Sequence, residues 1–262
     1  MKYLLILVLI FGVGQASFGK CGSGLAVFPE TESISPDGHI IIEAYGWGKS
    51  HELLKLLGQK YPIYLNSVEG KINLIQKDHI RGAKSWSQVL LIPEKKLVKG
   101  QVYTLVVEKL LPDDQIYLNP NRLYRNGKFK KAFWTVADET RSHKENNIIN
   151  YKHKSSNVTH YGCGPSVETS FEVVSSHKTN SMILTEILEV ETGKKSSYYL
   201  IINNKEIKVG HGMCSGPYSF IKDKTYKIRF NANFSNDQDD FTEWIVCRNP
   251  WRTEEDTNDD KR

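Results

Sequence analysis

The chain has 262 residues, and its 35 lysines and arginines exceed its 30 aspartates and glutamates to give a net charge of +5. This excess is too mild to favour a nucleic-acid-binding protein. Removing a leader of 19 residues from 262 leaves 243, which suits two domains of medium size because domains usually hold about 100–150 residues.

Residues 1–19 have the layout of a secretory signal peptide. Lys2 gives a basic start, residues 3–13 are apolar but too few to span a bilayer comfortably, and small residues follow up to Gly19. We therefore expect an exported protein, located in the periplasm, at the cell surface or outside the cell. No later apolar run approaches the ~20 residues of a membrane helix, so no integral membrane segment is expected after the leader is removed.

Short β-forming runs separated by turn residues recur over residues 20–140. The predicted strands are 39–45, 63–68, 71–76, 87–92, 102–108, 115–118 and 132–136. The one helical signal is residues 50–57, with Ser50 as the N-cap and Gly58 just past the end. Regular short strands favour an all-β sandwich, in which a two-turn helix is an insertion between strands.

Three stretches of this first domain resemble a known family. They are Ser35-Pro36-Asp37-Gly38 before a strand, the segment LIPEKKLVKGQVYTLVV at residues 91–107, and Phe133-Trp134-Thr135-Val136. Together they resemble a bacterial Ig-like domain of the surface-layer and adhesin type over residues 25–140. The resemblance implies an immunoglobulin-like sandwich with no catalytic residues.

The second half of the chain predicts another β domain. Polar and basic residues dominate 141–160, which is expected to be a linker. Residues 161–250 have a generic Ig-like or fibronectin-like strand rhythm, with a tight hairpin around Asn204 and an alternating strand with one buried face from Tyr226. The predicted strands are 167–174, 182–190, 197–203, 206–209, 218–221, 225–231 and 241–246. Residues 251–262 are expected to be a disordered tail. The predicted fold class is all-β: two immunoglobulin-like β-sandwich domains with a short helical insertion in the first.

Four cysteines are candidates for disulfides, because an exported chain meets an oxidising compartment. Cys21, Cys163, Cys214 and Cys247 allow three pairings. We favour Cys214–Cys247, with Cys21 joined to Cys163.

The same region also suggests a metal site or a hydrolase. His160 with Cys163 and His211 with Cys214 form two His-x-x-Cys pairs that could hold zinc. Residues 212–216 also have the spacing of a nucleophile elbow centred on Cys214, but a strand rather than the required helix is predicted after it. We therefore expect neither a catalytic site nor a cofactor, and keep a secreted hydrolase or metal-binding protein using these four residues as the alternative.

One aromatic residue is a candidate for ligand contact. Trp47 stands between Gly46 and Gly48, and an exposed aromatic ring on the rim of a sandwich is a common element of recognition. The alternative, which we favour from the sequence, is a ring that covers the edge of the core. The sequence predicts an exported, non-catalytic binding, adhesion or envelope-structural protein whose partner is a protein or a glycan surface. A carbohydrate-binding accessory module is the second alternative.

Overall fold

A computed structural model describes residues 21–110, 124–125, 128–129, 132–137, 150–174, 182–231 and 241–251. The predicted leader (1–19), the predicted strand 115–118 and residues 252–262 lie outside them. The described chain is all β except for one short helix, α2 (Lys49–Leu56). None of its helices is long and apolar enough to cross a membrane. The all-β prediction is confirmed.

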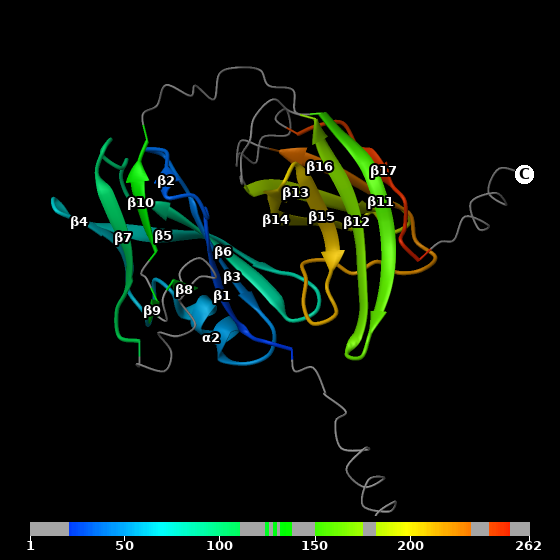
Figure 1. The fold of residues 1–262 in the computed structure, drawn as a ribbon, viewed down its shortest axis with the longest axis horizontal. Helices are drawn as coiled ribbons and strands as arrows, with labels where there is room; N and C mark the ends of the chain where they lie inside the picture. The colour runs from blue at the N-terminus through cyan, green and yellow to red at the C-terminus, as the bar shows by residue number, and fades with distance from the viewer. Residues whose placement is uncertain are drawn as a thin grey trace, which may run out of the picture.

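The first unit, residues 21–137, contains one sheet that folds over on itself. Its order is β1-β3-β6-β5-β4-β7-β10-β2. The strands are β1 (Gly24–Phe28), β2 (Ser33–Ile34), β3 (Ile40–Tyr45), β4 (Ile63–Ser67), β5 (Gly70–Arg81), β6 (Trp86–Pro93), β7 (Val102–Val107) and β10 (Phe133–Val136). β5 pairs with β4 up to Asn73 and with β6 from Leu74 onward, so it turns the corner between an outer half and an inner half, the latter made of β1, β3 and β6 (Figure 1).

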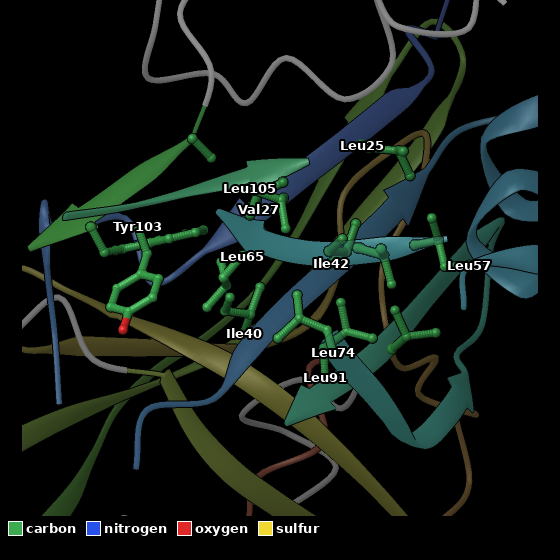
Figure 2. Packing of buried hydrophobic residues seen from close by; sticks show 14 of the residues in the cluster. Leu25, Val27, Ile40, Ile42, Leu57, Leu65, Leu74, Leu91, Tyr103 and Leu105 are labelled. Carbon is green, nitrogen blue, oxygen red and sulfur yellow. The ribbon is translucent and has the colours of Figure 1, made fainter. Parts of the chain in front are cut away.

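Apolar side chains fill the space between these two halves. Leu25, Ile42 and Leu91 of the inner half meet Leu65 and Leu105 of the outer half (Figure 2). Helix α2 closes one end with Leu53, Leu54 and Leu57. Because the side chains of a strand alternate between its two faces, each strand contributes every second residue to this core.

The second unit, residues 150–251, repeats the scheme. Its sheet order is β11-β12-β15-β14-β13-β16-β17. The strands are β11 (Asn150–Tyr161), β12 (Gly164–Val174), β13 (Met182–Glu189), β14 (Lys195–Asn203), β15 (Glu206–His211), β16 (Tyr226–Asn231) and β17 (Ile245–Cys247). β14 turns the corner, since it pairs with β13 up to Ile201 and with β15 from Ile202 onward. A separate two-stranded ribbon pairs β8 (Tyr124–Arg125) with β9 (Lys128–Phe129).

The inner half of the first unit packs face to face with the part of the second sheet that contains β13 and β14, which we call the inner half of the second unit. The molecule therefore has four layers (Figure 1). One apolar cluster contains side chains of both units: Ala26, Phe28, Ile41, Leu90, Met182, Leu184 and Tyr199. Trp86 of β6 enters the core of the second unit, where its ring lies 5.7 Å from that of Tyr198. The units are therefore joined through a buried interface, not through a linker alone.

A single glutamine completes this interface. Gln88 Nε2 donates to the Tyr199 carbonyl at 2.7 Å, and the Tyr199 N–H donates to Gln88 Oε1 at 3.1 Å. Gln88 thus takes the place of a neighbouring strand along β14 and satisfies two buried backbone groups, which would otherwise cost free energy. Its second N–H donates to Glu43 Oε2 at 3.0 Å.

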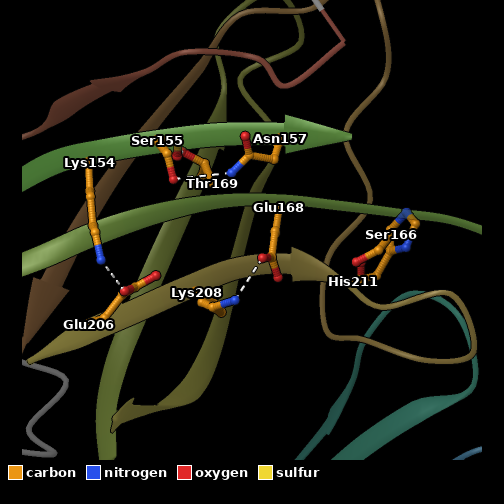
Figure 3. A network of polar contacts seen from close by, with 9 residues as sticks. All are labelled: Lys154, Ser155, Asn157, Ser166, Glu168, Thr169, Glu206, Lys208 and His211. Atoms are coloured by element: carbon orange, nitrogen blue, oxygen red, sulfur yellow. Dashed lines mark hydrogen bonds and ion pairs between the residues drawn. The ribbon is translucent and has the colours of Figure 1, made fainter. Parts of the chain in front are cut away.

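The predicted linker needs correction. Residues 150–160 belong to β11, which pairs with β12 in register from Asn150↔Val174 to Tyr161↔Gly164, so the second unit begins about ten residues before the predicted boundary at 161. Polar side chains made this strand read as a linker, yet they lie on the exposed face of the sheet. There Lys154 pairs with Glu206, and Lys208 with Glu168 (Figure 3).

Among the smaller predictions, the hairpin around Asn204 agrees with the structure, while two strands, the N-cap of the helix and the start of the tail differ from it. Residues 218–221 form no strand, and β17 covers only the last part of the predicted strand 241–246. Gly48, not Ser50, is the N-cap of α2. Trp251, placed in the tail by the sequence, donates its ring N–H to the Phe220 carbonyl at 2.9 Å. The hairpin around Asn204 is confirmed, because Asn204 and Lys205 both have positive φ.

Candidate functional site

A disulfide joins the two units. Cys21, just before β1, is bonded to Cys214, in the loop after β15. The pairings favoured from the sequence, Cys214–Cys247 and Cys21–Cys163, are therefore wrong. Cys247 is buried in the core of the second unit, where burial raises the pKa of its thiol to about 12. Cys163 is exposed in the turn between β11 and β12.

Five short segments gather around this disulfide, and we call them the disulfide end: residues 21–23, 46–48, 82–85, 161–164 and 212–217. The Ala83 N–H donates to the Pro217 carbonyl at 2.9 Å, and the Gly216 N–H donates to the Lys84 carbonyl at 3.3 Å. A Cβ on Gly164 would lie 3.8 Å from the Met213 carbonyl oxygen. Both units therefore build one end of the molecule, the end at which α2 and the tip of the β11–β12 hairpin lie (Figure 1).

Trp47 projects from this end and is 76% exposed. Gly46 has φ of +74° and Gly48 has φ of +121°, a left-handed region that disfavours other residues. Gly46 also lies so close to the Gly22 backbone that a Cβ would clash. The loop backbone thus requires glycine at positions 46 and 48, and the indole ring lies in solvent, whereas the favoured expectation from the sequence was a ring covering the edge of the core.

His51 holds the base of the same loop. Its Nε2 lies 2.7 Å from the Gly46 carbonyl oxygen, and its Nδ1 lies 2.8 Å from Ser87 Oγ. Since a carbonyl only accepts, Nε2 carries the proton in the neutral ring and Nδ1 accepts from Ser87. One helix residue therefore ties the Trp47 loop to β6. This role could not be predicted, because nothing in the sequence pairs His51 with Ser87.

The residues of the hydrolase or metal alternative do not form one site. Cys214 has its sulfur in the disulfide, so it offers no thiolate. His211 is buried with its ring bonded to the Gly212 carbonyl at 2.8 Å, and burial lowers its pKa. His160 is exposed near the Trp251 ring. Within the described ranges, no group of three or more His, Cys, Asp or Glu side chains could hold a metal ion.

A buried carboxyl group lies behind this end, in the interface. Glu43 accepts a hydrogen bond from Gln88, and burial raises its pKa from 4.5 to about 7, although hydrogen bonds from Gln88 and Trp86 act against that rise. Burial disfavours the charged form of a carboxyl group. The interface thus contains a carboxyl group that titrates near neutral pH. Nothing in the sequence around Glu43 indicates this environment.

The chain resembles several solved structures remotely. No protein-family model matches the chain, and no curated protein matches its sequence. A pullulanase from Anoxybacillus sp. LM18-11, solved with maltotriose, matches 88% of this chain at 10% identity with a TM-score of 0.26. A second structure of that pullulanase gives a TM-score of 0.24, and this chain covers 26% of either pullulanase chain. The tandem Ig repeats of Dlar match 86% of this chain and 97% of theirs, at 6% identity and a TM-score of 0.22. TM-scores this low establish neither a shared fold nor a shared function.

Proposed function

We propose that this protein is an exported, non-catalytic binding module that contacts its partner through Trp47 at the disulfide end. The observation that carries the proposal is the 76% exposed indole ring on a loop fixed by Gly46 and His51. Large aromatic rings are enriched among the residues that dominate binding, and a loop held in its bound conformation by its own contacts loses less conformational entropy when it binds.

Export is supported by two independent features. Residues 1–19 have the pattern of a signal peptide. The Cys21–Cys214 disulfide is a bond that persists in oxidising compartments and is rare in the cytosol. The periplasm, the cell surface and the extracellular medium all satisfy both features.

A binding role is favoured over the hydrolase or metal alternative by the state of Cys214. A nucleophilic cysteine must be a thiolate, and a cysteine ligand of zinc must be one too. The sulfur of Cys214 instead forms the disulfide with Cys21 that joins the two units. A binding module needs this rigidity, since it holds the five segments of the disulfide end in fixed positions.

Comparing two variants tests the proposal. Trp47→Ala removes the exposed ring, whereas Val68→Ala trims a side chain that is 93% exposed in the β4–β5 turn and serves as the matched control. Both should keep the wild-type melting temperature. On a glycan array and on envelope fractions of the source cells, we expect Trp47→Ala to weaken binding at least tenfold, as truncation of an aromatic anchor does. Binding that survives in Trp47→Ala, or that falls equally in both variants, contradicts the proposal.

A further inference from the structure

Basic side chains surround the base of the Trp47 loop. We call them the basic patch: His51 and Lys55 of α2, His79 and Arg81 at the end of β5, and Lys84 in the β5–β6 loop. Lys55, Arg81 and Lys84 are exposed, and His51 and His79 are half-buried.

The strand register places these residues on one side of the first unit. Arg81 pairs with Ser87, and Ser87 Oγ lies 2.8 Å from the ring of His51. His79 lies two residues before Arg81 and so points to the same face of β5. Lys55 follows His51 by four residues and lies on the same face of α2. Helix and strand therefore present their cations together.

The electrostatics agree with this placement. Burial lowers the pKa of His79, and the positive charges of Arg81 and Lys55 lower it further. Burial lowers the pKa of His211 as well, and the charge of Lys84 adds to that effect. Lys84 thus lies close enough to the second unit for its charge to act on His211, the last residue of β15.

Two acids close in sequence do not neutralise the basic patch. Asp78 pairs with Leu90 and points to the opposite face of β5, where its charge acts on Tyr199 in the interface. Glu52 lies on α2 beside His51 and is exposed. Of these two acids, Glu52 alone lies on an element that carries residues of the patch on the same side.

We propose that the partner bound at the disulfide end is an acidic polysaccharide, whose carboxylate or sulfate groups pair with Lys55, Arg81 and Lys84 while a sugar ring stacks on Trp47. This rests on the proposed binding function and adds the chemical class of the partner. Arginine and lysine pair with carboxylate and sulfate oxygens. A flat indole ring covers the apolar face of a sugar, so a cationic surface with one exposed tryptophan matches a charged sugar polymer better than a neutral one.

The test measures binding of the full exported chain to heparin, polygalacturonate and neutral dextran by biolayer interferometry, from 50 to 300 mM salt. We expect binding to both acidic polymers and not to dextran, weakening as salt rises because exposed charges are screened. Lys55→Gln/Arg81→Gln should weaken binding at least tenfold. The matched control, Lys194→Gln/Lys222→Gln, removes two exposed lysines of the second unit and should stay within twofold of wild type.

Three results would overturn this assignment. Absence of binding to both acidic polymers is the first, and equal losses in the two double variants, which indicate nonspecific attraction, are the second. The third is tighter binding to phosphatidylserine vesicles than to either polymer, which points to a lipid surface. Trp47-dependent binding to another partner that is insensitive to salt and to Lys55→Gln/Arg81→Gln would leave the binding function standing while refuting its acidic-glycan specificity.

Discussion

The carboxyl group of Glu43 gives a sharp test of the face-to-face interface. Glu43 lies on β3, faces the second unit and accepts a hydrogen bond from Gln88, which in turn holds Tyr199. Glu43→Gln keeps the shape and an acceptor oxygen but removes the ionisable proton. Because this carboxyl group lies in the interface, the change alters how the stability of the whole chain depends on pH.

The magnitude follows from the pKa. Burial raises the pKa of Glu43 from 4.5 to about 7, which corresponds to about 3 kcal/mol. Because the folded-state pKa lies above the unfolded one, the native state retains the proton longer than the unfolded state does. The contribution of Glu43 is therefore most favourable below pH 4.5 and is lost as the pH rises through about 7. At pH 8, Glu43→Gln should be more stable than wild type by about 1–3 kcal/mol.

Urea denaturation of the oxidised protein at pH 4.5, 6, 7 and 8 measures this difference. The wild-type curve should lose more stability between pH 4.5 and 8 than the Glu43→Gln curve, and the two should converge at the acid end. Glu30→Gln, which removes an exposed carboxylate, is the matched control. A Glu43→Gln variant with the wild-type pH profile, or one less stable than wild type at pH 8, would contradict the raised pKa of Glu43 in the interface.

Two further predictions concern the contacts between the units. Gln88→Leu leaves the N–H and C=O of Tyr199 without their partner and should cost about 2–4 kcal/mol by urea denaturation at pH 6, whereas a loss below about 0.5 kcal/mol would mean that Gln88 does not bridge the units. The Cys21–Cys214 bond spans 193 residues, so Cys21→Ser/Cys214→Ser should lower the free energy of unfolding by about 3–5 kcal/mol, and an unchanged midpoint would contradict the bridge.

Most strands could be predicted because their residues carry strong local signals. The predicted runs at 39–45, 63–68, 87–92 and 102–108 agree with β3, β4, β6 and β7 to within one residue at each end. Gly58, expected just past α2, has φ of +76°. Such signals are local, since they depend on β-branched residues, on glycine and on alternation over a few positions.

Strand β11 and the face-to-face packing were missed because their causes are not local. β11 exposes polar side chains and is a strand because β12 lies beside it. β16 was predicted to bury one face, yet Arg229 and Asn231 on its other face are buried too. Arg229 is covered by the rings of Phe241 and Trp244 of its own unit. Asn231 is paired with Leu184, which belongs to the apolar cluster shared by the two units. The consecutive apolar residues Ile40, Ile41 and Ile42 were a signal that β3 is covered on both faces.

In the candidate site, too, features with a local sequence signal could be anticipated, and features that depend on distant contacts could not. Flanking glycines made Trp47 a candidate for an exposed ring, but a ring covering the edge of the core was favoured, and the side chain is in fact exposed. His51 and the Cys21–Cys214 bond could not be assigned, because contacts between residues 36 and 193 positions apart leave no trace in spacing. The basic patch likewise depends on a register that pairs Arg81 with Ser87.

A non-reducing peptide map tests most directly the claim that two packed units build one binding end. We expect a single linked pair of peptides, one containing Cys21 and the other Cys214. A map that joins Cys214 to Cys247, with Cys21 bonded to Cys163 or left reduced, would contradict it, because the second unit would then be closed on itself and the disulfide end would lose its bond.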